Sequence, residues 1–194
     1  MAKKPAKSSK RRIDTEVSLI KPRRQAPIAV ALVYPNRYHV GMSNLGFQSV
    51  YRLINDIDHV VCERVFLPET SQPQTTPLKT FESGKLLSDT DIIAFSLSFE
   101  NDYPHILSIL DSIGLPLRAD QRGDQDPLLI AGGVTSFLNP EPIAAFFDCF
   151  LIGEAEAMLP RFLEDFEPAN NKRAALKAIA RNVPGAYVPA FYSI

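Results

Sequence analysis

The chain has 194 residues, of which 45% are hydrophobic and 22% are charged, and its net charge is −1. These values are ordinary for a soluble globular protein and leave room for one compact domain and little more. No stretch reaches about 18 consecutive apolar residues, so no membrane span is expected.

Residues 1–26 are predicted to form a basic tail. Residues 1–24 carry nine Lys or Arg against Asp14 and Glu16, a net charge of +7, so the remainder carries −8. The opening letters MAKKPAKSSKRR contain no apolar run, which excludes a signal peptide. We expect a disordered, solubilising tail, and the alternative is an arm that binds nucleic acid or another partner.

Apolar runs after the tail predict five β-strands. The first, third and fourth runs are nearly continuous, as expected for central parallel strands covered on both faces. The second alternates in its latter half, which suits an edge strand. The runs are IAVALVY (28–34), HVVCERVF (59–66), DIIAFSLSF (91–99), PLLIAGGV (127–134) and CFLIG (149–153).

Segments with helical periodicity separate these runs. Ser43 or Asn44 can cap the first helix, and a second helix is expected between Asp102 and Gly114. Further helices are expected after Asn139, after Gly153 (where Pro160 would limit or kink the helix) and over 170–182. Positions expected to face the sheet are Phe47, Val50, Tyr51 and Ile54 in the first helix, and Ile106, Ile109 and Leu110 in the second. The alternation predicts an α/β fold, a three-layer doubly wound parallel sheet with right-handed crossovers.

The connection over 67–90 is unusually long and has no helical stripe. Ser83-Gly84 suits a tight turn between two short extended pieces. A connection of this length is often functional or faces a partner.

Two cysteines, Cys62 and Cys149, each lie inside an apolar run. Two distant thiols without a signal peptide favour a reducing, cytoplasmic location over a disulfide framework. They are too few for a zinc or iron–sulfur site, so no metal site is expected in this chain, and both thiols are predicted to be core residues.

The stretch YPNRYHVGMSNLG after the first strand imitates a phosphate-binding loop. Gly41 and Gly46 have the correct spacing, but Phe47 and Gln48 stand where Lys and Ser or Thr are needed. The spacing therefore does not indicate an NTPase.

Ligands of open parallel sheets bind beyond the carboxyl ends of the strands. Ser96 and Ser98 share one face near the end of the third run, and Glu100 continues that face if the strand extends. Gly132-Gly133 would let the backbone approach a ligand closely, or would serve only a tight turn.

At these strand ends the sequence resembles a known family. AGGVTSFLNPEP followed by FDCFLIGEAE resembles the GG-x6-PE and D-x4-GE-x-E pattern of the cobalamin-binding-type domain that precedes many radical SAM enzymes. YPNRYHVGMSNLGFQSVYRL, CERVFLPE, FESGKLLSD and IIAFSLSFENDYP are similar to the N-terminal region of one family of large radical SAM Fe–S oxidoreductases. The resemblance spans residues 27–192.

The resemblance implies a Rossmann-like domain over 27–194 with the flavodoxin strand order 2-1-3-4-5, ahead of a radical SAM barrel of the same polypeptide. That barrel would bind a [4Fe–4S] cluster through C-x-x-x-C-x-x-C and cleave S-adenosylmethionine. This chain has no such motif. We therefore expect an N-terminal fragment without catalytic residues, whose main partner is the missing barrel.

The resemblance also implies that cobalamin is the cofactor of this domain. The residues expected to line the corrinoid face come from the strand ends. They are Tyr34, Pro35, Asn36, Gly41, Met42, Ser43, Asn44, Ser96, Ser98, Gly132, Gly133 and Gly153.

His39 departs from the pattern of cobalamin domains that supply a histidine below cobalt. Those domains carry D-x-H-x-x-G, whereas here Arg37 replaces the acid and Gly41 comes one residue early. Because a ligating imidazole usually needs such an acceptor behind it, we expect His39 to be structural or at the solvent edge.

Two other functions stay open. The domain could be a cofactor-free module that docks a substrate or partner, or an RNA-binding accessory domain that uses the basic tail. The net charge of −8 outside the tail weakens the RNA alternative.

Overall fold

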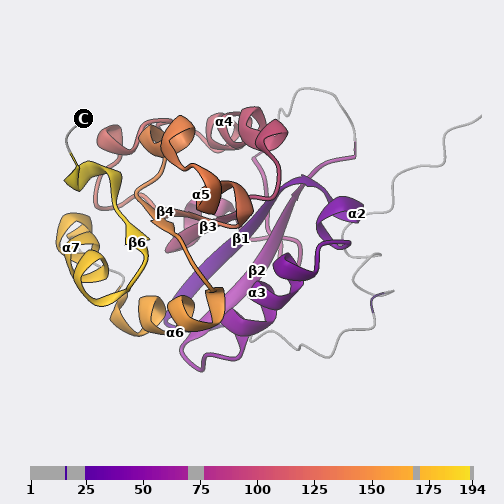
Figure 1. Cartoon of the computed structure of the whole chain (residues 1–194). Helices are drawn as coiled ribbons and strands as arrows, with labels where there is room; N and C mark the ends of the chain where they lie inside the picture. The colour runs from indigo at the N-terminus through magenta and orange to yellow at the C-terminus, as the bar shows by residue number, and fades with distance from the viewer. Residues whose placement is uncertain (1–15, 17–24, 70–76, 168–170, 193–194) are drawn as a thin grey trace, which may run out of the picture.

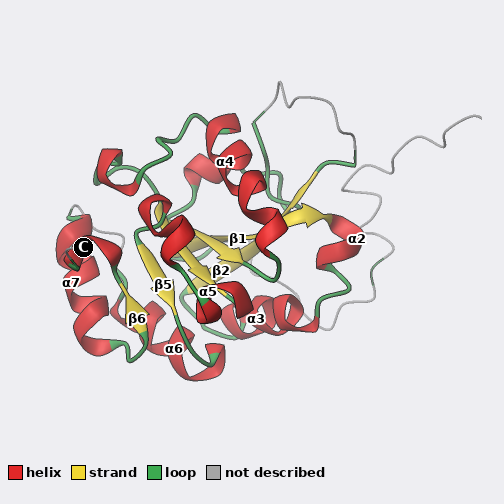
Figure 2. Cartoon of the chain, turned by 45° about the horizontal axis from the view of Figure 1, so that its top comes forward, coloured by secondary structure: helices red, strands yellow, loops and turns green. Residues whose placement is uncertain are grey.

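The computed structural model describes residue 16 and residues 25–69, 77–167 and 171–192. Helices cover both faces of a central sheet, which confirms the predicted three-layer α/β architecture (Figures 1 and 2). The described strands run in the order β2-β1-β3-β4-β5-β6. The strands are β1 (Ile28–Arg37), β2 (Val60–Leu67), β3 (Ile92–Ser96), β4 (Leu128–Gly132), β5 (Cys149–Leu151) and β6 (Ala186–Tyr187).

All neighbours from β2 to β5 pair in parallel, so the flavodoxin order is confirmed. The short strand β6, which the sequence did not predict, adds antiparallel to β5. β1 also runs to Arg37 rather than ending at Tyr34, so Pro35 and Asn36 belong to the strand end.

The helices follow the strands as expected for right-handed crossovers. They are α2 (Tyr38–Gly41), α3 (Leu45–Asn55), α4 (Tyr103–Ser112), α5 (Val134–Leu138), α6 (Ala155–Asp165) and α7 (Lys172–Asn182). Pro160 lies inside α6 without ending it. Short 3₁₀ turns lie at Leu87–Asp89, Glu100–Asp102, Ala119–Gln121, Glu141–Phe146 and Pro189–Phe191.

Alternating side chains of each central strand fill two cores. Val30 and Leu32 of β1 pack toward α3, α6 and α7, whereas Ala31 and Val33 pack toward α4. The two helical layers lie on opposite sides of the sheet in Figure 1. Burial on both faces explains the nearly continuous apolar runs.

Helix α3 is positioned by a side-chain cap and an apolar stripe. The Oδ1 atom of Asn44 accepts a hydrogen bond of 2.8 Å from the amide of Phe47, which confirms the predicted cap. Phe47, Tyr51 and Ile54 are buried and Val50 is half-buried, as predicted. In α4 the inward residues Ile106, Ile109 and Leu110 are buried as well.

The predicted tight turn in the long connection is confirmed. Lys79 and Leu86 form an antiparallel bridge, and Gly84 has φ of 78°. The segment then lies along β2, where the amide of Phe81 donates to the carbonyl oxygen of Arg64. Residues 70–76 of this connection lie outside the described residues.

A buried arginine holds this connection to β2. Arg64 donates from Nε to Glu82 at 2.6 Å and from Nη2 to Glu16 at 2.8 Å. Its guanidinium also lies 4.8 Å from the ring centre of Tyr51 and 5.2 Å from that of Phe81. Burial works to lower the pKa of Arg64, but the two carboxylates outweigh it and hold the pKa above its usual range. Glu16 of the predicted tail is thus joined to the folded part, whereas residues 1–15 and 17–24 lie outside the described residues.

Both cysteines are buried core residues, as predicted. Burial raises the pKa of the Cys149 thiol to about 12 and also raises that of Cys62. Among the helices that the structure describes, none is long and apolar enough to cross a membrane.

Candidate functional site

A small cleft opens at the carboxyl ends of the central strands, between the sheet and helices α3 and α6. Its volume is about 80 Å³. The floor is apolar, with Leu32, Ala94, Ile130 and Leu151 contributed by four neighbouring strands. Four of the residues predicted for the corrinoid face line it, namely Ser96, Gly132, Gly133 and Gly153.

The period of two along the strands explains why small residues open this cleft. Ser96 has the same parity as Ile92 and Ala94, which pack toward α3 and α6. Gly132 likewise follows Leu128 and Ile130. The last inward positions of β3 and β4 are therefore too small to fill the space between sheet and helices.

The loops after β1, β3 and β4 are tied together above this cleft. The amide of Asn44 donates to the hydroxyl of Ser98 at 3.1 Å. The amide of Leu97 donates to the carbonyl oxygen of Gly132 at 2.8 Å, and its carbonyl accepts from the amide of Thr135 at 3.4 Å. Asn44 and Ser98, both predicted for the site, thus lie together.

The two adjacent glycines have different requirements. Gly133 has φ of 109°, and a Cβ atom there would lie 2.4 Å from the carbonyl oxygen of Leu97, so the turn itself requires glycine. A Cβ atom on Gly132 would meet only the carbonyl oxygen of Leu151 at 3.5 Å, an ordinary contact. Each of the two predicted roles therefore applies to one glycine. Gly133 is needed for the tight turn, and Gly132 leaves space in the cleft.

The third strand does not extend to Glu100. β3 ends at Ser96, and a 3₁₀ turn begins at Glu100, so Glu100 does not extend the serine face. The amide of Leu97 still donates to the carbonyl oxygen of Gly132, but the carbonyl of Leu97 accepts from the amide of Thr135 in α5.

The remaining predicted residues lie outside the cleft lining. Tyr34 is buried, and its ring centre lies 5.4 Å from that of Phe47. Gly41 packs against Phe66, where a Cβ atom would approach within 2.6 Å. The sulfur of Met42 lies 3.1 Å from Nη1 of Arg64.

Three predicted residues are left, Pro35, Asn36 and Ser43, and each contacts a neighbouring part of the chain. Ser43 is exposed and donates to the carbonyl oxygen of His39, which is itself exposed on α2. Pro35 and Asn36 contact α4 and the turn before it, as follows.

Two members of a polar cluster at the same edge, Asp102 and His105, were missed by the sequence reasoning. The amide of Asn36 donates to Oδ1 of Asp102 at 2.8 Å. The Nδ1 atom of His105 lies 2.8 Å from the carbonyl oxygen of Pro35 and 3.5 Å from Oδ1 of Asp102. The available signal was a histidine in the first turn of the helix after the third strand.

Large apolar side chains are exposed around this edge. They lie at the start of α3, along α5 and after β3, and each is more than half exposed. This apolar rim consists of Leu45, Phe99, Val134, Phe137 and Leu138. Exposed apolar residues gathered at one edge of a fold indicate a surface that another molecule or domain covers.

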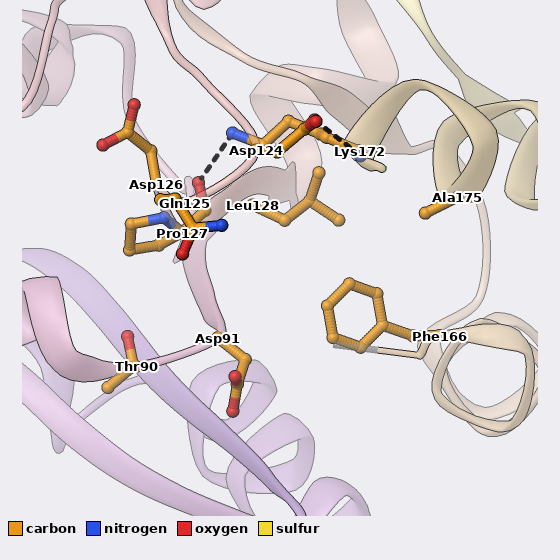
Figure 3. A pocket seen from close by; sticks show the side chains of 10 residues that line it. All are labelled: Thr90, Asp91, Asp124, Gln125, Asp126, Pro127, Leu128, Phe166, Lys172 and Ala175. Carbon is orange, nitrogen blue, oxygen red and sulfur yellow. Dashed lines mark hydrogen bonds between the residues drawn. The ribbon is translucent and has the colours of Figure 1, made fainter. Parts of the chain in front are cut away.

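Larger hollows lie at the opposite, amino edge of the sheet. One of about 220 Å³ is lined by Asp91 before β3, Asp124 and Asp126 before β4, and Lys172 of α7 (Figure 3). Another of about 420 Å³ shares Asp124 and Lys172. Three of these carboxylates accept hydrogen bonds from backbone amides, so they hold turns and strands in place. Burial lowers the pKa of Lys172.

No group of three or more His, Cys, Asp or Glu side chains that could hold a metal ion occurs in the described part of the chain. The site therefore offers a small cleft, backbone groups, hydroxyls and amides. Such a set can hold and orient a ligand.

The chain is similar to a known protein family and to a longer relative. Residues 46–189 match the family model described as radical SAM proteins, N-terminal. The uncharacterized protein MJ0966 of Methanocaldococcus jannaschii is 27% identical over 127 residues. That match covers 66% of this chain but 24% of the relative, so the chain corresponds to about a quarter of the longer protein. No solved structure matches the chain. Since the family model covers most of the chain, the protein belongs to the family of N-terminal domains of radical SAM proteins.

Proposed function

We propose that this domain binds a corrinoid at the carboxyl edge of its sheet and presents it to a radical SAM catalytic domain. The observation that carries the proposal is the cleft lined by Ser96, Gly132, Gly133 and Gly153. It lies where ligands of open parallel sheets bind. The [4Fe–4S] cluster and S-adenosylmethionine would belong to the catalytic domain.

The size and lining of the cleft fit part of such a ligand. A volume of about 80 Å³ is well below the roughly 300–1,000 Å³ of a complete small-molecule pocket. One arm of a corrinoid would enter the cleft, and the remainder would be covered by the apolar rim and the catalytic domain. When bound, the corrinoid would supply a cobalt centre able to carry a methyl group.

The residues of this chain would position the ligand. Gly132 keeps the cleft open, and the hydroxyl of Ser96 offers a hydrogen bond at its mouth. Asn44 and Ser98 join the loops after β1 and β3, which limits the motion of the edge. Corrinoids carry peripheral amides, which suit these donors and acceptors.

The test is an absorbance and calorimetric titration with hydroxocobalamin. Wild-type chain is expected to show saturable binding, and Gly132→Val is expected to weaken it at least about tenfold, corresponding to 1.4 kcal/mol, because the new side chain fills the cleft. Gly123→Val, at the amino edge, is the matched control, since a Cβ atom on Gly123 would lie 4.0 Å from Oδ2 of Asp126, an ordinary contact. Equal binding by both variants would remove the cleft from the proposal, and an unsaturable wild type would contradict corrinoid binding by this domain.

A second candidate, a cofactor-free docking module, is favoured by the apolar rim alone. In that case Phe137→Asp, at an exposed position of α5, would weaken association with the separately produced catalytic domain, and hydroxocobalamin would not change that association. Under the corrinoid proposal, hydroxocobalamin would strengthen it.

A further inference from the structure

We propose that Arg64 and Tyr38 form a carboxylate-binding site that Glu16 of the N-terminal segment occupies, and that this docking holds the loop after β1 in place. Glu16 and Arg64 are 48 positions apart, so the contact joins two distant parts of the sequence. Glu16 is one of two acidic residues among the first 24, which carry nine Lys or Arg. The docking does not depend on corrinoid binding.

Glu16 is held by both of its oxygen atoms. Nη2 of Arg64 donates to Oε2 at 2.8 Å, and Nη1 donates to Oε1 at 3.3 Å. The hydroxyl of Tyr38 donates to the same Oε1 atom. A guanidinium that binds both oxygens of a carboxylate makes a stronger and more specific contact than a single hydrogen bond does. The Glu16 side chain is 15% exposed, so the carboxylate is largely removed from solvent.

Neutralisation of charge does not by itself explain this contact. Glu82 already gives Arg64 a carboxylate, since its Oε1 atom accepts from Nε at 2.6 Å and its Oε2 atom accepts from the backbone amide at 2.7 Å. The Arg64 side chain is 7% exposed, so little water can reach Nη1 and Nη2. Buried donors need acceptors. Glu16 supplies the acceptors for these two nitrogens.

Aromatic rings from several elements build the walls of the site. The guanidinium lies 4.8 Å from the ring centre of Tyr51 in α3 and 5.2 Å from that of Phe81. The ring of Tyr38 stacks on Phe81 at 5.1 Å and meets Phe66 of β2 at 5.3 Å. Contacts between a cation and aromatic faces favour one position of the guanidinium. They do not involve Glu16, so the site is expected to keep its shape when Glu16 is absent.

The same site contacts the loop after β1. The sulfur of Met42 lies 3.1 Å from Nη1 of Arg64, and Tyr38 begins α2. The amide of Met42 donates to the carbonyl oxygen of Tyr38 at 2.9 Å. Asn44, at the end of this loop, binds Ser98 in the loop after β3. Removal of the docked carboxylate takes away contacts at the start of the loop, so the loop should open more often.

Chemical rescue of a Glu16→Gly variant of the whole chain tests the site. Hydrogen exchange at the backbone amides of Met42 and Asn44 should be about tenfold faster than in the wild type, because charged hydrogen bonds are lost. Acetate should slow this exchange towards the wild-type rate in a saturable manner, since it restores a carboxylate to Arg64. Sodium chloride at the same pH and ionic strength should not. Acetate should leave the wild type unchanged, because its site is filled.

Matched variants separate recognition of the carboxylate from general stability. Glu141 also accepts from a tyrosine hydroxyl, that of Tyr187 in β6, at the opposite end of the sheet from β2. Glu141→Gly should therefore leave exchange in the loop unchanged, with or without acetate. Tyr38→Phe keeps the ring but removes the hydroxyl. Added to Glu16→Gly, it should raise the acetate concentration needed for half-maximal rescue about threefold to tenfold.

Three results would overturn the inference. Unchanged loop exchange in Glu16→Gly would show that the loop does not depend on the docking. Faster exchange that acetate does not reverse would show that Glu16 acts through packing and that Arg64 is not a carboxylate-binding site. An equal response to Glu141→Gly would indicate a general loss of stability. Hydroxocobalamin is absent from these measurements, so their failure would leave the proposed function unaffected.

Discussion

The two edges of the sheet use their polar residues differently. At the amino edge, Asp91 accepts from the amide of Ala29 at 2.7 Å, and Asp148 accepts from the amide of Leu129 at 2.8 Å. At the carboxyl edge, β3 and β4 end in serine and glycine, apolar side chains are exposed, and the buried Oδ2 atom of Asp102 has no hydrogen-bond partner among the described residues.

Whether polar groups are already bonded within the chain distinguishes a structural edge from a functional one better than the volume of a hollow does. The amino edge contains the larger hollows, but its carboxylates already bind backbone amides of the same chain. The carboxyl edge has a smaller cleft and groups that its own fold does not use. We therefore expect substitutions at the amino edge to change stability alone, whereas substitutions at the carboxyl edge should also change binding where they touch the cleft or the loops around it.

The largest effect is expected for Asp148→Ala at the amino edge. Asp148 lies 3.3 Å from Nη2 of Arg122, whose side chain is fully buried. Removing the carboxylate leaves a buried cation without its partner, which should lower the free energy of unfolding by about 3–5 kcal/mol. Urea denaturation measures this loss.

The control is Asp120→Ala, which breaks the exposed pair with Arg118 and should leave the unfolding midpoint unchanged. Similar losses in the two variants would contradict the structural role of Asp148. Folded Asp148→Ala should still bind hydroxocobalamin with wild-type affinity.

The second prediction compares two adjacent glycines at the carboxyl edge. Gly133→Ala should destabilise the fold by about 1–3 kcal/mol, because φ of 109° and the close carbonyl of Leu97 both oppose a side chain. Gly132→Ala should leave stability unchanged or raise it by up to about 1 kcal/mol, since its space is free. Thermal unfolding of the pair tests this, and equal losses would show that Gly132 also serves the turn.

The third prediction compares two asparagine caps. Asn44 caps α3 at the carboxyl edge, and Asn171 caps α7 through a 2.9 Å bond to the amide of Ala174. Each substitution to alanine should cost about 1 kcal/mol of unfolding free energy. Only Asn44→Ala should also weaken hydroxocobalamin binding, and a matching loss in Asn171→Ala would indicate a general effect of stability.

The smallest effect concerns thiol chemistry. Cys62 and Cys149 are buried and their pKa values are raised, so at pH 8 they stay protonated and should not react with a thiol reagent in the folded chain. A cysteine introduced as Ser98→Cys at the carboxyl edge should react, and bound corrinoid should slow that reaction. Rapid modification of the wild type would contradict the closed core.

Much of the fold could be predicted because its signals are local. Apolar runs identified the five parallel strands, and Asn44 and Gly114, with φ of 71°, marked helix ends from a few neighbouring residues. Two-residue β6 could not be predicted, because its strand character comes from pairing with Phe150 and Leu151. The candidate site was found in part, through the rule that ligands bind at strand ends.

The sequence by itself determined which segments are strands and helices, and which edge carries small residues, because periodicity and turn chemistry act between near neighbours. Only the tertiary structure decided which of those residues meet. His105 and Pro35 are 70 positions apart, and Asn36 and Asp102 are 66 apart. Their contacts depend on how β1 and β3 align in the sheet, and no local pattern records that alignment. The same dependence separates Gly132, which leaves the cleft open, from Gly133, which the carbonyl of Leu97 requires to be glycine.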